Sequence, residues 1–141
     1  MKILITGAKG FIGKNLIAEL RNRKYYDIFE CDRDTDPSLL DEYYKESDFV
    51  FHLAGDNRPK EQSEFMEENF GFTSDLLNSL KKNSNTCPVM ISSSVQAELD
   101  NPYGESKKAG DDLVLAYAKE TRAKVLVYRF PNVFGKLCRP N

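Results

Sequence analysis

The residues best suited to chemistry in this chain are a tyrosine, a lysine and a serine in its second half. Tyr103 and Lys107 are four positions apart, so they would share one face of a helix. A phenol with a pKa near ~10 is a poor proton donor at neutral pH, but a nearby ammonium group lowers that pKa. Ser94, with Ser93 as the alternative, offers a hydroxyl that can hold an oxygen. The set is suited to protonating a carbonyl oxygen while a hydride attacks the carbon.

A glycine-rich turn near the N-terminus points to the source of such a hydride. Gly7, Gly10 and Gly13 lie between a predicted buried strand, residues 2–6, and a predicted helix, residues 11–21. Such a turn lets the backbone approach a pyrophosphate, whose charge is favoured at the helix N-terminus. A plain strand-to-helix turn is the alternative. The candidate dinucleotide-binding residues here are Gly7, Lys9, Gly10, Phe11, Ile12 and Gly13.

Two adjacent charged residues argue for different cofactors. Asp32 ends the second predicted strand, where an acid that binds the ribose hydroxyls of NAD is expected. Arg33 follows at once and could bind the 2′-phosphate of NADP. Two exposed loop charges are the alternative to both interpretations.

Composition limits the classes of function. The 141 residues carry a net charge of −2 without a long basic run, so neither a nucleic acid nor a membrane is an expected partner. Three widely spaced cysteines and one histidine do not suggest a metal site, and we expect reduced thiols in a cytoplasmic protein. His52 lies within an apolar strand and is interpreted as structural rather than as an acid or base.

Short apolar runs alternate with segments of helical periodicity, which predicts one α/β domain over residues 1–141. The further strands are expected at 27–32, 48–53, 88–92 and 124–128, and the further helices at 39–44, 63–80 and 102–119. Alternating strands and helices favour a doubly wound parallel sheet covered on both faces. We expect the strand order 3-2-1-4-5.

The chain resembles the short-chain dehydrogenase/reductase superfamily, extended type, whose members handle nucleotide sugars. The matching segments span nearly the whole chain: residues 7–13, 52–55, 69, 92–94, 103–107 and 129–135. The resemblance implies an NAD(P)-binding Rossmann fold with Ser94, Tyr103 and Lys107 as catalytic residues. It implies further cofactor contacts at Leu53, Ala54, Gly55, Asn69, Tyr103, Lys107, Phe130 and Asn132. It implies substrate contacts at Ser94, Gln96 and Asn132.

Several segments are most similar to capsular-polysaccharide enzymes of the staphylococcal type, among them residues 52–59, 92–97, 101–107 and 128–132. This resemblance implies reduction of a 4-keto-6-deoxy UDP-N-acetylhexosamine with NADPH. A nucleotide-sugar epimerase or dehydratase with tightly bound NAD is one alternative. A cofactor-binding module without catalysis is another, although a pure sensor would need only the glycine loop.

The length of the chain departs from this family pattern. A complete extended reductase carries a C-terminal substrate lobe, and the staphylococcal-type enzymes add a cupin domain. We therefore expect these 141 residues to be a fragment that lacks both parts and is poorly active alone, because an uncovered cleft would stay wet. The full-length protein is expected to form a homo-oligomer.

Overall fold

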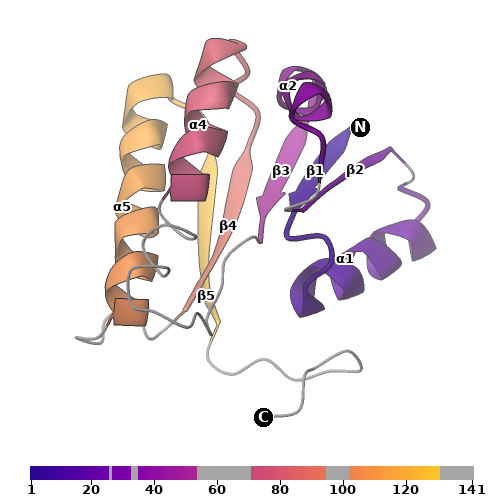
Figure 1. Cartoon of the computed structure of the whole chain (residues 1–141), viewed down its shortest axis with the longest axis horizontal. Helices are drawn as coiled ribbons and strands as arrows, with labels where there is room; N and C mark the ends of the chain where they lie inside the picture. Colours follow the sequence, from indigo (N-terminus) through magenta and orange to yellow (C-terminus); the bar gives the residue numbers. More distant parts are fainter. Residues whose placement is uncertain (26, 33–34, 54–70, 95–101, 131–141) are drawn as a thin grey trace.

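The computed structural model describes residues 1–25, 27–32, 35–53, 71–94 and 102–130, with the backbone alone at 93, 94, 102–107, 129 and 130. Its centre is a five-stranded parallel sheet in the order β2-β1-β3-β4-β5 (Figure 1). The strands are β1 (Ile3–Thr6), β2 (Ile28–Cys31), β3 (Phe49–His52), β4 (Val89–Ser94) and β5 (Val125–Phe130). Parallel strands end at one edge, so all five carboxyl ends face the same side of the sheet.

The doubly wound parallel fold is confirmed, but the predicted strand order 3-2-1-4-5 is wrong. β3 pairs with β1 rather than with β2, so β2 lies at the edge of the sheet. Burial explains the arrangement, since all four residues of β1 are buried whereas Glu30 of β2 is exposed. An interior position suits β1, and an edge position suits a strand that carries a charge.

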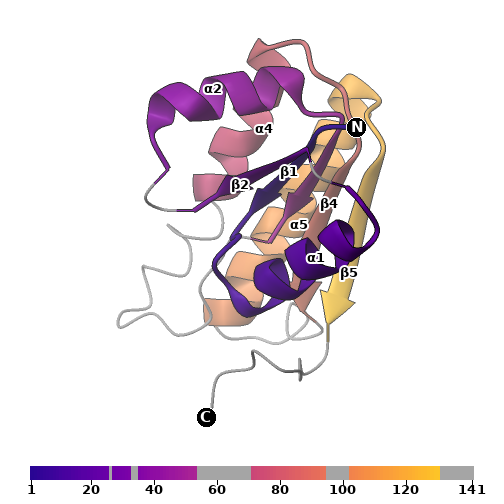
Figure 2. The ribbon, with the colours of Figure 1, turned by 90° about the vertical axis from the view of Figure 1, so that its right-hand side faces the viewer.

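Helices cover the two faces of the sheet unequally in the part of the chain that the structure describes. The helices α2 (Pro37–Glu46), α4 (Phe72–Lys82) and α5 (Pro102–Thr121) lie on one face, and α1 (Phe11–Asn22) lies on the other (Figure 2). The predicted helix at 63–80 is confirmed from 72 onward, and its earlier residues lie outside the described ranges. No helix within the described ranges is long and apolar enough to cross a membrane.

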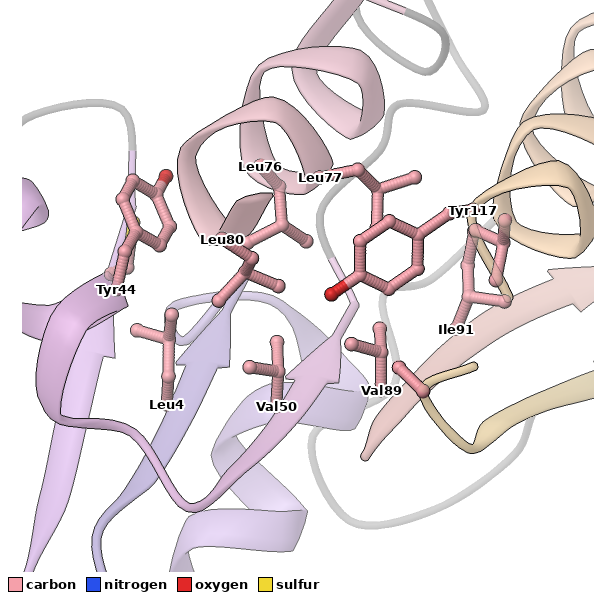
Figure 3. Close-up of a cluster of buried hydrophobic side chains, with 12 residues drawn as sticks. Leu4, Tyr44, Val50, Leu76, Leu77, Leu80, Val89, Ile91 and Tyr117 are labelled. Carbon is pink, nitrogen blue, oxygen red and sulfur yellow. The ribbon is translucent and has the colours of Figure 1, made fainter. Parts of the chain in front are cut away.

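The larger core lies between the sheet and the three helices (Figure 3). Its labelled members are Leu4, Tyr44, Val50, Leu76, Leu77, Leu80, Val89, Ile91 and Tyr117. Leu76 and Leu80 are 0 % exposed and Leu77 is 2 % exposed, and burying such a side chain contributes roughly 1.5–3 kcal/mol. A smaller cluster packs α1 against the other face through Ile3, Ile5, Ile17 and Leu20.

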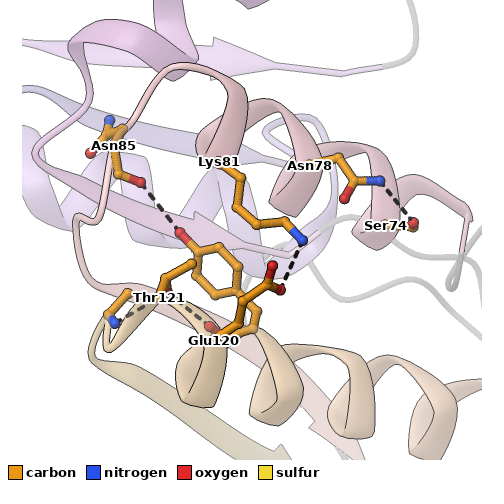
Figure 4. Close-up of polar contacts among 8 residues, drawn as sticks. Ser74, Asn78, Lys81, Asn85, Glu120 and Thr121 are labelled. Carbon is orange, nitrogen blue, oxygen red and sulfur yellow. Dashed lines mark hydrogen bonds and ion pairs between the residues drawn. The ribbon is translucent and has the colours of Figure 1, made fainter.

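Asn85 ties together the elements at the amino end of the sheet. Its Nδ2 donates to the carbonyls of Tyr44, at 2.7 Å, and Ser47, at 2.9 Å, and its Oδ1 accepts from the Cys87 N–H at 3.0 Å. The Tyr117 hydroxyl donates to the Asn85 carbonyl at 3.3 Å (Figure 4). The Asn85 side chain thus joins the end of α2 to the turn before β4, and the Asn85 main-chain carbonyl adds a bond from α5.

Candidate functional site

The glycine loop joins the carboxyl end of β1 to α1 and folds into a tight turn. Gly7 has φ 69°, a left-handed conformation that favours glycine, and its carbonyl accepts the Gly10 N–H at 3.0 Å. The Ala8 N–H donates to the Cys31 carbonyl at 3.2 Å, which fixes the loop to the end of β2. The loop is therefore held on both sides by backbone hydrogen bonds.

The third glycine lets α1 press against this loop. A Cβ at Gly13 would lie 2.2 Å from the Gly7 carbonyl oxygen, and no backbone could tolerate that contact without shifting. Gly10 precedes the helix and has no side chain that could cap the amides of its first turn. The result is a close-packed strand–loop–helix whose helix N-terminus suits an anionic group such as a pyrophosphate.

An ion pair spans the gap between the loop and β2. The Lys9 Nζ lies 3.3 Å from Asp32 Oδ2, and the Asp32 N–H donates to Thr35 Oγ1 at 2.9 Å. The Lys9 side chain is largely exposed, whereas the Asp32 side chain is 21 % exposed. Next to them, burial and then the Asp32 charge raise the pKa of the Cys31 thiol, which disfavours its thiolate form.

The carboxyl ends of β1 and β3 meet at the point where the strand order of the sheet reverses, which is where ligands bind in open α/β sheets. The Leu53 N–H donates to the Thr6 carbonyl at 3.3 Å and to Thr6 Oγ1 at 3.1 Å. His52 lies between Thr6 and Thr73, with both ring nitrogens at hydrogen-bonding distance from a threonine hydroxyl. The sequence analysis missed Thr6 and Thr73, although a polar residue that ends a buried strand was a usable signal.

The backbone brings the three candidate catalytic positions to this same edge. Ser94 is the last residue of β4, paired in register with Phe130 at the end of β5. Tyr103 and Lys107 lie in the first two turns of α5. Their positions continue, at helical spacing, the stripe that holds the buried residues Gly110 and Val114.

The remaining candidate residues are not described by the structure. Arg33, Ala54, Gly55, Asn69, Gln96 and Asn132 all lie outside the described ranges. Within those ranges, no group of three or more His, Cys, Asp or Glu residues could hold a metal ion.

Comparisons with known proteins bear on this arrangement. The chain is 40 % identical over 141 residues to UDP-2-acetamido-2,6-beta-L-arabino-hexul-4-ose reductase of Pseudomonas aeruginosa, covering 100 % of this chain and 38 % of the relative. It is 46 % identical to the crystal structure of the capsular polysaccharide assembling protein CapF from Staphylococcus aureus, with a TM-score of 0.87, covering 100 % of this chain and 38 % of CapF. The chain thus spans well under half the length of each.

A third relative is a more distant match. The structure of RMD from Pseudomonas aeruginosa complexed with NADPH is 25 % identical with a TM-score of 0.74, over 94 % of this chain and 55 % of RMD. The resemblance to extended short-chain reductases, and to the staphylococcal-type capsular enzymes among them, is confirmed by these matches. The model of the NAD dependent epimerase/dehydratase family matches residues 3–141, and the chain belongs to that family.

Proposed function

We propose that this chain is the dinucleotide-binding domain of an NADPH-dependent reductase. Its substrate is a UDP-N-acetylhexosamine with a 4-keto, 6-deoxy sugar, used in making capsular polysaccharide precursors. The observation that carries the proposal is the 40 % identity, over the whole chain, to a relative named as a hexul-4-ose reductase. The positions of Ser94, Tyr103 and Lys107 at the ligand-binding edge support it.

Each candidate catalytic residue has a separate task in this reaction. When NADPH is bound, its nicotinamide supplies the hydride that reduces the C4 carbonyl carbon. Ser94 holds the carbonyl oxygen, and Tyr103 gives that oxygen its phenolic proton, so the ketone becomes an alcohol. Lys107 lowers the pKa of the Tyr103 phenol by its charge and binds the nicotinamide ribose.

The Lys9–Asp32 ion pair supports NADPH over NADH. Asp32 alone would favour the ribose hydroxyls of NAD and repel a 2′-phosphate. Lys9, whose Nζ is 3.3 Å from the carboxylate, offsets this repulsion and brings a cation to the same place. Arg33 follows Asp32 in the sequence and can add a second positive charge.

A turnover assay tests the proposed reaction. The full-length gene product is mixed with NADPH and the UDP-linked 4-keto sugar, and both NADPH consumption and the alcohol product are measured. Stoichiometric NADPH loss supports the reductase. Product formation without net cofactor change would point instead to the epimerase or dehydratase alternative. Cofactor binding without any turnover would point to a non-catalytic module.

Calorimetric titration with NADPH and NADH tests the choice of cofactor. We expect Lys9→Met to weaken NADPH more than NADH, because only NADPH carries the 2′-phosphate. Asp32→Ala should weaken NADH more than NADPH. The reverse result for Lys9→Met would remove Lys9 from NADPH binding, and the reverse result for Asp32→Ala would reassign Asp32.

The proposal also covers the cellular location and the oligomeric state of the protein. We propose a cytoplasmic enzyme that works as a homo-oligomer in its full-length form. Its UDP-sugar substrate and NADPH are cytoplasmic metabolites in such a scheme. Light scattering of the full-length gene product tests the oligomeric state, and a monomer would contradict it.

A further inference from the structure

Three buried polar side chains form one hydrogen-bonded chain beside the glycine loop. Thr6 ends β1, His52 ends β3 and Thr73 lies in the first turn of α4, and all three are at most 2 % exposed. The His52 Nδ1 lies 2.7 Å from Thr6 Oγ1, and its Nε2 lies 2.8 Å from Thr73 Oγ1. A single imidazole ring therefore connects both strands at the point of reversal to the helix packed over them.

The partners of the ring favour one tautomer. The Leu53 N–H donates to Thr6 Oγ1, so the Thr6 hydroxyl can donate its own hydrogen bond to His52 Nδ1. A neutral ring whose Nδ1 accepts carries its proton on Nε2, which then donates to Thr73 Oγ1. The ring also stacks on Phe72, with centroids 5.6 Å apart and planes at 5°. This apolar contact suits an uncharged imidazole.

The Thr73 end of this hydrogen-bonded chain reaches the helix that carries Tyr103 and Lys107. A Cβ at Gly110 would lie 4.0 Å from Thr73 Oγ1 and 3.9 Å from Ile91 Cδ1, so α5 passes close to Thr73. Gly110 follows Lys107 by one helical turn. The Thr6 end directly precedes Gly7, the first residue of the glycine loop. One end of this hydrogen-bonded chain thus adjoins the glycine loop, and the other lies close to α5.

We propose that His52 is a positioning residue, a neutral Nε2–H imidazole that fixes the glycine loop relative to α4 and α5. This inference rests on the proposed function, because it treats the glycine loop and α5 as the cofactor side and the catalytic side of one site. His52 itself touches neither the cofactor nor the substrate in this proposal. It acts through Thr6 and Thr73, which hold the strand end and the helix at a fixed separation.

The tautomer can be measured without a cofactor, since His52 is the single histidine of the chain. Long-range ¹H–¹⁵N correlation spectra of the labelled chain at neutral pH distinguish the three forms of the ring. We expect a protonated Nε2 and an unprotonated Nδ1. A proton on Nδ1, or on both nitrogens, would overturn the proposal.

Hydrogen exchange tests the coupling between helix and loop. Thr73→Val keeps the shape of the side chain and removes the hydroxyl, so we expect the Leu53 and Gly10 amides to exchange about fivefold faster, the effect of one neutral hydrogen bond. Thr73→Ser should restore the slow exchange. The matched control is Thr121→Val, which removes a helical threonine hydroxyl bonded to the Tyr117 carbonyl at 2.8 Å, and it should leave both amides unchanged.

The pattern of exchange separates positioning from general destabilisation. The amides of Val50 and Val89, which donate to the Pro88 and Lys124 carbonyls near the amino ends of β3 and β4, should keep their wild-type rates in Thr73→Val. Equal acceleration at all four amides, or no change at Leu53 and Gly10, would contradict a positioning role.

A dinucleotide titration connects this proposal to the proposed function. We expect Thr73→Val to raise the Kd for NADPH by about fivefold and Thr73→Ser to restore it, for the same reason of one hydrogen bond. If the Kd for NADPH stays unchanged while amide exchange is altered, His52 stabilises the fold but does not position the cofactor-binding loop. If the unaltered chain binds neither NADPH nor NADH, the proposed function fails, while the ring tautomer and the exchange rates still decide the role of His52.

Discussion

The two ends of the sheet are both built from polar side chains, but those side chains bind different kinds of partner. At the amino end, the amide of Asn85 binds three backbone groups of the protein itself. At the carboxyl end, the polar side chains bind one another, as His52 binds Thr6 and Thr73, and Lys9 binds Asp32. The first arrangement substitutes for missing secondary-structure hydrogen bonds, whereas the second fixes the relative positions of loops and helices around a ligand edge.

This difference shows that a cluster of hydrogen-bonded polar side chains does not by itself indicate a functional site. The cluster around Asn85 is as well connected as the one around His52, but it adjoins no glycine loop and no candidate catalytic position. Substitutions at the two ends should therefore have different effects. Those at the amino end should change the free energy of unfolding, and those at the carboxyl end should change cofactor binding or turnover.

The largest expected effect is on turnover, from Tyr103→Phe. Removing the hydroxyl of a general acid typically costs a factor of about 10²–10⁴ in rate. Cofactor affinity and the free energy of unfolding should stay close to those of the unaltered protein. NADPH consumption by the full-length gene product measures turnover, calorimetry measures cofactor affinity, and urea unfolding measures the free energy of unfolding. Unchanged turnover would remove Tyr103 from the mechanism.

Asn85→Ala should give the opposite pattern at the amino end. It removes three hydrogen bonds and leaves the carbonyls of Tyr44 and Ser47 without this donor, so we expect the free energy of unfolding to fall by about 3 kcal/mol. Urea unfolding measures the change, and NADPH affinity of the folded protein should not move. Asn78→Ala is the control, because the amide of the exposed Asn78 donates to the Ser74 hydroxyl at 3.4 Å (Figure 4), and its effect should stay within about 0.5 kcal/mol.

The carboxyl end should respond to Gly13→Ala mainly through cofactor binding. The new Cβ would meet the Gly7 carbonyl oxygen at 2.2 Å, so the loop must move away from α1. A hydrogen bond to a charged group contributes about 1.5–3 kcal/mol, so losing one loop amide from the pyrophosphate would lower NADPH affinity roughly 10- to 150-fold. Calorimetric titration measures it. Wild-type affinity in a folded Gly13→Ala variant would show that the loop does not set the cofactor position.

How much of this could be predicted from the sequence depends on the range of the interactions. The strands, the helices and the glycine loop are local, and their apolar runs and spacing predicted them. The position of β3 was predicted wrongly, because apolar runs do not say on which side of β1 a later strand pairs. The exposed Glu30 in β2 was the one available signal that β2 lies at an edge.

The partners within the two hydrogen-bonded clusters were harder to predict from the sequence. Asn85 binds carbonyls 41 and 38 residues earlier in the chain, and nothing in a turn sequence specifies such partners. His52 was correctly interpreted as buried within a strand, but its link to Thr73 depends on how α4 packs. Among the candidate site residues, those chosen from the glycine pattern lie together in the loop after β1 and the first turn of α1, while several chosen from family resemblance lie outside the described ranges.

Alkaline pH should weaken the fold through Cys87, at the amino end. Burial, then the charge of Asp48, raises the pKa of the Cys87 thiol to about 11. The folded state thus holds this proton more tightly than the unfolded state, so the contribution of Cys87 to stability is constant below about pH 9 and is lost as the pH rises towards 11. Urea unfolding across this range measures the fall.

Cys87→Ala should make the fall shallower, whereas Cys31→Ala, at the carboxyl end, should reduce it less. The pKa of Cys31 is also raised by burial, but a hydrogen bond with Thr35 lowers it in part. Equal slopes in the two variants would mean that the two buried thiols contribute alike and that the amino end is not the more alkali-sensitive one.

The smallest expected effect is a gain in stability from Gly110→Ala. Its new Cβ would lie 3.9 Å from Ile91 Cδ1 and 4.0 Å from Thr73 Oγ1, which are ordinary van der Waals contacts. Alanine also loses less backbone entropy than glycine in a helix interior, so the free energy of unfolding should rise by about 0.5–1 kcal/mol. Urea unfolding of Gly110→Ala and Gly13→Ala, measured side by side, compares the two glycines. Close packing requires glycine at position 13 but not at position 110. A loss of stability instead would show that α5 approaches Thr73 too closely for any added carbon, and that the separation between α4 and α5 is as tightly set as that between α1 and the glycine loop.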